Sequence, residues 1–294
     1  MKTPIFCGSA IAIITPFTES GIDYARLGKL IEWQIASGTD AIIISGTTGE
    51  SSTMTHLEHT DVIRFCVETV NKRVPVVANA GSNSTEESLS LSRAAQQCGA
   101  DGLLLVTPYY NKTTQAGLVG QFSYIADRVN IPIVLYNVPS RTGLSFTADT
   151  YYALSKHPTI NGIKEASGDL GLVAQTRAKC GGDLFIWSGN DENIVPILSL
   201  GGKGVISVMA NIIPAETARI CALWREGKAK ESMALQLKYM GLIDALFCEV
   251  NPIPVKTAMA AMRLDSGRLR MPLWPMGEQN KAFLLDEMRK VGLL

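Results

Sequence analysis

Short apolar segments rich in isoleucine, valine and leucine recur along the chain, and each is followed by a turn signal and a stretch with helical periodicity. A continuous apolar run of this length is typical of a strand that is buried on both faces, as in a parallel sheet. We predict eight such strands, over residues 10–17, 41–45, 74–80, 102–107, 131–138, 160–165, 184–188 and 204–209.

The segments between these strands repeat their apolar residues at helical spacing. Leu27, Leu30 and Ile31 mark the face of one helix, and Leu57 and Val62 mark the face of the next. Strand and helix alternate eight times, which is the number that a closed α/β barrel, the (β/α)8 TIM barrel, requires. An open doubly wound sheet is the alternative, but it usually carries a Gly-x-Gly-x-x-Gly motif after its first strand, and this chain has none there.

The last part of the chain follows a different pattern. Helical periodicity continues over residues 218–224, 233–246 and 255–262, interrupted by prolines. We therefore divide the chain into a barrel that carries the active site, residues 1–213, and a region with the last barrel helix and a C-terminal helical appendage, residues 214–294. Lys256 begins a helix in this region, and we expect its stem to reach solvent.

Composition narrows the range of functions. The chain has 27 basic and 27 acidic residues, so its formal charge is zero and it has no excess of positive charge for nucleic acid. We see no apolar run long enough to span a membrane and no secretory signal, and we expect a cytoplasmic protein. The six cysteines are widely spaced, without a metal-binding pattern, and we expect reduced thiols.

Lys164 is the most informative residue for function. It lies in the predicted strand 160–165, where its side chain would point into a barrel of branched apolar residues, and burial there disfavours the ammonium form. A neutral amine is a nucleophile that forms a Schiff base with a carbonyl substrate. Most lysines are solvated surface groups, so other residues must support this interpretation.

Further polar residues follow other predicted strands. Residues 46–51, Gly-Thr-Thr-Gly-Glu-Ser, offer backbone N–H groups and two hydroxyls for a carboxylate, although an ordinary turn with a helix cap has the same pattern. Tyr136 can relay protons with a hydroxyl such as that of Thr48, or simply pack. Arg141 offers a fork for a second carboxylate, or is an ordinary surface arginine.

Together these motifs carry a family resemblance. The segments 46–50, 107–111, 136–143 and 163–169, with 251–256 further along, occur in the order seen in the 4-hydroxy-tetrahydrodipicolinate synthases, also called dihydrodipicolinate synthases. The chain resembles this family over essentially its whole length. The resemblance implies a class I aldolase that condenses pyruvate with L-aspartate 4-semialdehyde, in the biosynthesis of diaminopimelate and lysine, with no metal and no cofactor.

The resemblance also implies roles for individual residues. Lys164 would form the imine with pyruvate, Thr47 and Thr48 would hold the pyruvate carboxylate, and Tyr136 would be the general acid and base. The remaining implied site residues are Tyr110, which completes the proton relay with Thr48 from a neighbouring subunit, Arg141, which binds the carboxylate of the semialdehyde, and Gly189 and Ile206, which line the site.

A second group of residues matches the positions at which lysine-inhibited members of the family bind their end product. They are Ser51, His56, His59, Asn83, Glu87 and Tyr109, and we expect them to bind L-lysine as a feedback inhibitor, unless they are simply solvated helix residues. The shared use of Tyr110 implies at least a dimer, and the resemblance suggests a homotetramer built as a dimer of dimers.

Three alternatives stay open. N-acetylneuraminate lyase and the sugar-acid aldolases share the chemistry, but such relatives usually have Ser where this chain has Thr47, and they lack an arginine at the position of Arg141. A non-catalytic, ligand-sensing barrel would have lost the lysine, the tyrosine or the threonines.

The loop after Tyr110 departs from the family pattern at Thr113 and Ala116, and we expect this loop to be looser than in other members of the family.

Overall fold

The computed structural model describes residues 2–294, and its strands close into one barrel in the order of the sequence. Each strand pairs in parallel with its two neighbours, and β1 pairs with β8 to close the barrel. The strands are β1 Gly8–Ala12, β2 Ala41–Ile44, β3 Val76–Asn79, β4 Gly102–Val106, β5 Ile133–Asn137, β6 Ile160–Glu165, β7 Phe185–Ser188 and β8 Gly204–Ser207. The predicted (β/α)8 barrel is confirmed.

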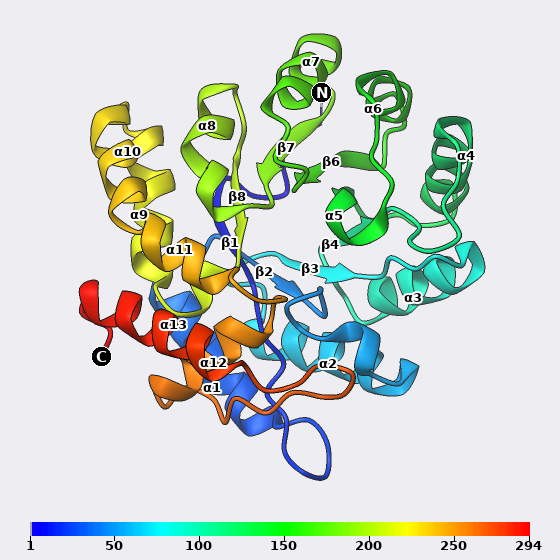
Figure 1. The fold of residues 1–294 in the computed structure, drawn as a ribbon. Helices are drawn as coiled ribbons and strands as arrows, with labels where there is room; N and C mark the ends of the chain where they lie inside the picture. Colours follow the sequence, from blue (N-terminus) through cyan, green and yellow to red (C-terminus); the bar gives the residue numbers. More distant parts are fainter. Residues whose placement is uncertain (1) are drawn as a thin grey trace.

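Helices surround the strands, as Figure 1 shows in a view into the barrel. Those that lie between strands or directly follow β8 are α1 Tyr24–Ala36, α2 His56–Val70, α3 Thr85–Gln97, α4 Gln115–Ala126, α5 Pro139–Thr142, α6 Ala148–Ser155, α7 Leu170–Cys180, α8 Ile194–Ser199 and α9 Pro214–Arg225. Side-chain caps define several helix starts. Thr55 and Glu58 form a reciprocal capping box at the start of α2.

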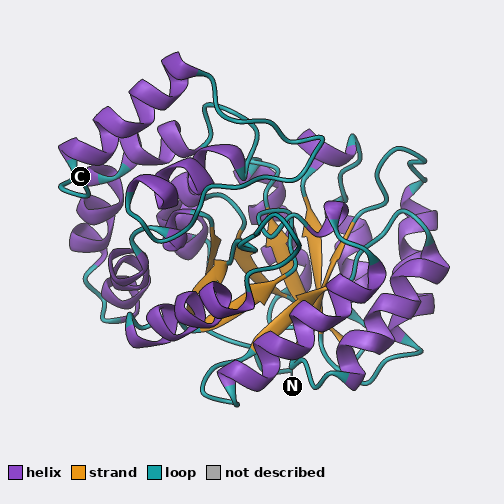
Figure 2. Cartoon of the chain, turned by 90° about the horizontal axis from the view of Figure 1, so that it is seen from below, coloured by secondary structure: helices purple, strands orange, loops and turns teal. Residues whose placement is uncertain are grey.

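The C-terminal region adds further helices to one side of the barrel, visible in Figure 2. They are α10 Ala229–Lys238, α11 Met240–Leu246, α12 Ile253–Ala261 and α13 Glu278–Lys290. Helix α13 packs against α11 and α12. The pattern of residues 233–246 predicted one helix, but it is divided between α10 and α11 at Tyr239, and α13 was not predicted.

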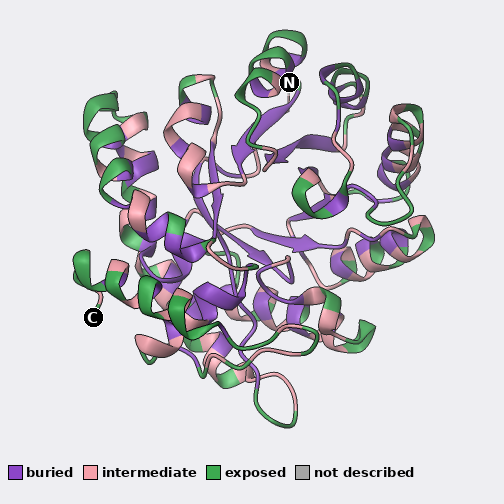
Figure 3. Ribbon diagram, in the orientation of Figure 1, coloured by how far each residue is buried: buried purple, intermediate pink, exposed green. Residues whose placement is uncertain are grey.

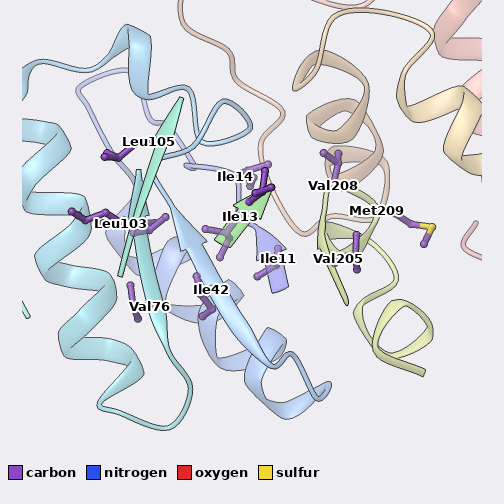
Figure 4. Close-up of a cluster of buried hydrophobic side chains, with 14 of the residues drawn as sticks. Ile11, Ile13, Ile14, Ile42, Val76, Leu103, Leu105, Val205, Val208 and Met209 are labelled. Carbon is purple, nitrogen blue, oxygen red and sulfur yellow. The ribbon is translucent and has the colours of Figure 1, made fainter. Parts of the chain in front are cut away.

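Two apolar layers follow from the alternation of side chains along each strand. Residues such as Ile42, Val76 and Leu103 point outward and pack under the helices, as the close-up in Figure 4 shows. Their neighbours, including Ile43 and Trp187, point inward and fill the barrel. Figure 3 shows buried strands and helices whose outer faces are exposed. The interior is therefore a packed core, and in barrels of this kind the functional groups lie at the carboxyl ends of the strands.

Two details of the prediction were wrong. The first strand was expected to continue to residue 17, but β1 ends at Ala12 because Ile14 donates its backbone N–H to the side chain of Asn211 instead of to a strand. Leu57 was expected on the buried face of α2, but its side chain is 72% exposed. The sequence of an apolar run does not show which of its residues keep the backbone hydrogen bonds of the sheet.

Candidate active site

Lys164 and Tyr136 lie side by side on neighbouring strands and point into the barrel. Tyr136 of β5 pairs in register with Lys164 of β6, and Ile163 before the lysine points outward, so strand alternation turns Lys164 inward. Lys164 is 6% exposed, and its Nζ lies 4.5 Å from the centre of the Tyr136 ring. The expected inward orientation of the lysine is confirmed.

A cavity of about 530 Å³ opens above this pair. Its wall includes Lys164, Tyr136, Thr48, Arg141 and Gly189, which are site residues predicted from four separate segments. Residues of α11 and of the loop before α12 close the other side of the cavity. The C-terminal region is therefore part of the site and does more than cover the barrel.

Gly189 makes room for the side chain of Lys164. A Cβ atom at this position would lie 3.1 Å from Cγ of Lys164 and 2.6 Å from Cβ of Ala166, so a larger residue would displace the lysine stem. Ile206 of β8 is fully buried in the inner apolar cluster with Tyr136 and Trp187, and it does not belong to the cavity wall. It supports the site from below instead of lining it.

The loop of residues 46–51 turns in a way that the sequence did not indicate. Ser45 and Glu50, and not the glycines between them, adopt the left-handed conformation, each with φ of 55°. Gly49 is required for a different reason: a Cβ there would lie 3.2 Å from the carbonyl oxygen of Ile13 and 3.3 Å from Cα of Ser45. The loop therefore packs closely against the segment that follows β1.

The C-terminal region holds Thr48 and Arg141 through one residue, Asn251. The Asn251 side chain donates from Nδ2 to Oγ1 of Thr48 at 3.0 Å, and its carbonyl oxygen accepts a hydrogen bond from Nη2 of Arg141 at 2.9 Å. Asn251 belongs to the segment that carries the family resemblance, but the sequence indicated no role for it. These contacts join residues 203 and 110 positions apart, so no local pattern could have revealed them.

Lys256 corrects one of our expectations. We expected its stem to reach solvent, but the residue is fully buried, and its Nζ forms an ion pair with the buried carboxylate of Glu50. The ammonium also donates to the carbonyl oxygen of Arg268 at 2.8 Å and lies 4.3 Å from the centre of the Phe17 ring. Burial lowers the pKa of Lys256, while Glu50 opposes this shift. The lysine therefore has a structural position beside the site.

A second hydrogen-bond network lies on the outer side of β6, next to Lys164. Glu165 points outward from β6, where its carboxylate accepts hydrogen bonds from Nδ2 of Asn137 at 3.0 Å and from the Tyr151 hydroxyl at 2.9 Å. Burial raises the pKa of the Glu165 carboxyl, although these donors and Ser167 oppose the shift. The network links β5, β6 and α6, and so holds the strands of Tyr136 and Lys164 in register.

Five of the six residues predicted to bind lysine line a neighbouring cavity of about 360 Å³. They are Ser51, His56, His59, Glu87 and Tyr109. The sixth, Asn83, donates from Nδ2 to the carbonyl oxygen of Tyr109 at 3.2 Å. Thr47 also faces this cavity, and Tyr136 and Arg141 border both cavities. The two threonines that were predicted to act together therefore face different cavities.

The two histidines of this cavity differ in environment. His56 is exposed and pairs through Nε2 with Glu87 at 2.8 Å. His59 is buried, and burial lowers its pKa, so the ring is neutral at pH 7. Its Nε2 lies 2.8 Å from the carbonyl oxygen of Asn79 and, in the neutral ring, must donate to it. Bonds from Ser82 and His56 hold the pKa of the Glu87 carboxyl below its usual value.

Tyr110 is set apart from both cavities. Its side chain is 93% exposed, and its backbone has φ of 68°, a strained conformation for a residue other than glycine. The flanking loop is tied to the segment before α3, because Asn111 donates from Nδ2 to the carbonyl oxygen of Asn83 at 2.9 Å. Within this single chain, Tyr110 does not join the other predicted catalytic residues.

Two further expectations concern the state of the cysteines and the presence of membrane-spanning segments. All six cysteines are free, as predicted, and three of them are buried. Over residues 2–294, no helix has both the length and the apolar character needed to cross a membrane.

Comparison with known proteins identifies relatives across the whole chain. Residues 5–290 match the model of the dihydrodipicolinate synthetase family. A 4-hydroxy-tetrahydrodipicolinate synthase of Clostridium perfringens (strain SM101 / Type A) is 53% identical over 290 residues, which cover 99% of this chain and all of the relative.

Solved structures of similar proteins agree in fold. The chloride-inhibited dihydrodipicolinate synthase of Acinetobacter baumannii, complexed with pyruvate, matches with a TM-score of 0.96 at 42% identity, over 98% of this chain and 99% of the other. The DHDPS of Cyanidioschyzon merolae, with lysine bound, matches with a TM-score of 0.96 at 37% identity, over 99% of this chain and all of the other.

Proposed function

The chain belongs to the dihydrodipicolinate synthetase family, and from this membership we propose how its own residues carry out the reaction. The enzyme is a lyase that condenses pyruvate with L-aspartate 4-semialdehyde to give 4-hydroxy-tetrahydrodipicolinate. N-acetylneuraminate lyase and sugar-acid aldolase activity are the less favoured alternatives. The roles that we assign to individual residues rest on the family resemblance together with the geometry of the site.

The observation that carries the proposal is the buried pair of Lys164 and Tyr136 at the base of one cavity. The amine of Lys164 would add to C2 of pyruvate, and water would leave as the imine forms. The protonated imine then accepts the electron pair that remains when C3 loses a proton, and the resulting enamine attacks the aldehyde carbon. Because the imine is itself the electron sink, the proposed steps need neither a metal nor a cofactor.

Each proton transfer in this scheme needs an acid or base close to the imine. Tyr136 is the nearest candidate by its register with Lys164, and the Thr48 hydroxyl borders the same cavity. We assign the pyruvate carboxylate to Thr48, which borders the cavity of Lys164, and to the preceding Thr47, which borders the adjoining cavity. We assign Arg141 to the carboxylate of the semialdehyde. Arg141 borders both cavities, and this position supports its assignment to the carboxylate of the semialdehyde.

The proposal is tested directly by mixing the purified protein with pyruvate and L-aspartate 4-semialdehyde and following formation of the cyclic product. We expect turnover that saturates with both substrates. If the protein cleaves only sialic acid or a sugar acid, the proposed Schiff-base chemistry is upheld and the substrate assignment is wrong.

We further propose that Tyr110 acts in the site of a neighbouring subunit, since its exposed side chain borders neither of the two cavities described above. Tyr110→Phe should lower kcat at least about tenfold. Co-expression with Lys164→Ala should then restore up to roughly a quarter of wild-type activity, because half of randomly formed dimers hold one complete site of two. Activity equal to the mean of the two parents, or a fully active monomer in light scattering, would contradict the shared site.

L-Lysine is the ligand that we propose for the cavity bordered by His56, His59 and Glu87, since Glu87 offers a carboxylate to an ammonium group. Lysine should inhibit the initial rate of the wild type. Glu87→Gln should raise the half-inhibiting concentration about tenfold to a hundredfold, as expected for loss of a charged hydrogen bond. Glu86→Gln, which changes the adjacent exposed carboxylate, is the matched control and should leave inhibition unchanged. A wild-type rate that saturating lysine does not alter would rule out this role.

A further inference from the structure

Arg270, in the segment between α12 and α13, reaches back to the start of α2. Its guanidinium forms a bidentate ion pair with Glu58, with Nη1 2.9 Å from Oε2 and Nη2 2.6 Å from Oε1. Nη1 also donates to the carbonyl oxygen of Thr53 at 3.3 Å. A guanidinium only donates, so the direction of each bond is fixed. One side chain thus joins the C-terminal region to the 3-10 turn Ser51–Thr53 and to the first turn of α2.

The two elements that Arg270 holds form part of the cavity that we assign to L-lysine. The turn Ser51–Thr53 contributes two serines to the wall of this cavity, and the first turn of α2 contributes His56 and His59. Successive helix residues are about 100° apart, so Glu58 lies about 160° around α2 from His56 and about 100° from His59. Arg270 itself lies outside the cavity wall. It therefore holds the helix from behind, on the side away from the ligand.

We infer that Arg270 is a positioning residue of the lysine cavity: by holding Glu58 and the turn before α2, it fixes the place at which His56 and His59 face the ligand. The inference rests on the lysine binding proposed above and deepens it, since it gives the C-terminal region a part in regulation. Because Arg270 lies outside both cavities, its side chain should affect the affinity for lysine and leave the reaction unchanged.

The surroundings of the pair distinguish it from an ordinary surface ion pair. The side chains of Arg270 and Glu58 are 25% and 27% exposed, and the guanidinium lies 4.3 Å from the centre of the buried Phe17 ring. The bonds from Arg270 lower the pKa of the Glu58 carboxyl to about 2, so the carboxylate is ionised at pH 7. The same carboxylate accepts the backbone N–H of Thr55 at 3.0 Å, within the capping box of α2. The pair is thus built into the helix start.

The main chain of Arg270 has a separate task. Its backbone N–H donates to Oε2 of Glu50 at 3.1 Å, and Glu50 also pairs with Nζ of Lys256. These contacts hold the loop that carries Thr48, and none of them uses the side chain of residue 270. A change of that side chain should therefore leave kcat and KM for pyruvate within about twofold of the wild type.

The test compares lysine inhibition in Arg270→Met and in Glu58→Gln. Methionine keeps an apolar stem against Phe17 but makes none of the bonds of the guanidinium. We expect the half-inhibiting concentration of L-lysine to rise about threefold to tenfold, since ligand binding must then order the first turn of α2. Glutamine can still cap Thr55 but is no longer a charged partner for Arg270, so Glu58→Gln should raise the same concentration.

A double-mutant cycle shows whether Arg270 acts through Glu58. The double variant should raise the half-inhibiting concentration by less than about twofold beyond the larger single effect. Arg268→Met is the matched control, because it removes the same charge two residues earlier in the chain. The Arg268 side chain is 45% exposed and pairs with the exposed Glu19 at 2.9 Å. This control should leave both lysine inhibition and kcat unchanged.

The outcomes separate this inference from the lysine site on which it rests. Rates are compared per site that traps pyruvate with borohydride, so unfolded protein does not count, and if Arg270→Met traps none, Glu58→Gln decides alone. A lysine-inhibited wild type whose half-inhibiting concentration shifts less than about twofold in these variants overturns the positioning role. So does an equal shift in Arg268→Met, or additive effects in the cycle. A wild type that lysine neither inhibits nor binds in calorimetry overturns the proposed lysine site, and this inference with it.

Discussion

Lys164→Ala is expected to abolish both imine formation and turnover, with kcat lowered by roughly 10³-fold or more, because the covalent intermediate cannot form without the amine. The fold should be retained. The lysine lies at the carboxyl end of β6, where its removal enlarges an existing cavity and leaves no buried partner unpaired among residues 2–294. Far-UV circular dichroism and the denaturation midpoint should therefore match the wild type.

The measurement is borohydride reduction in the presence of pyruvate, followed by peptide mapping by mass spectrometry. The adduct should map to Lys164 in the wild type and be absent from Lys164→Ala. Lys203→Ala is the matched control, because Lys203 precedes β8 at the opposite end of the barrel, with its Nζ 5.7 Å from the centre of the Phe185 ring. An adduct on Lys256, the other buried lysine of the region, would show that the wrong amine was assigned.

The largest stability effect is expected from Lys256→Met. This change leaves the carboxylate of Glu50 buried without its ammonium partner, and breaking a buried pair in this way typically costs about 3–5 kcal/mol of unfolding free energy. Replacing both partners, Glu50→Gln with Lys256→Met, should cost clearly less than the single change, since no uncompensated charge remains. Urea denaturation at a fixed protein concentration measures both.

Lys72→Met is the matched control for this experiment. Lys72 also pairs with a carboxylate, that of Asp101 at 2.8 Å, but its side chain is 65% exposed. Loss of such a surface pair should cost less than about 1 kcal/mol. If Lys256→Met costs no more than Lys72→Met, the buried pair does not hold the loop of Thr48 to the C-terminal region.

The error about Lys256 shows where sequence reasoning stops. Prolines at positions 252 and 254 correctly indicated a helix start, and α12 begins at Ile253. A lysine near such a start usually extends to solvent, and nothing in the local pattern contradicts that expectation. The ammonium of Lys256 is buried because it pairs with the carboxylate of Glu50, 206 positions earlier in the chain. This contact forms only in the closed barrel. The partner of a buried charge depends on this long-range contact.

The same limit applies to the candidate site. Lys164, Tyr136 and Thr48 could be chosen from the sequence because parallel strands bring their carboxyl ends to one edge, and each of these residues lies at or directly after a strand end. It could not be inferred in this way that Thr47 and Thr48 border two different, neighbouring cavities. This arrangement follows from the left-handed turns at Ser45 and Glu50, which no glycine marks in the sequence.

What could be determined from the residues alone was the alternation of strand and helix, the closed barrel and the order of the reactive groups around its mouth. These follow from hydrophobic periodicity, which acts over a few neighbouring residues and is written directly in the chain. The tertiary structure decided where each strand ends, that Lys256 is buried, and that the side chain of Asn251 contacts Thr48. These outcomes depend on contacts between segments more than a hundred residues apart, and only the closure of the barrel brings such segments within hydrogen-bonding distance.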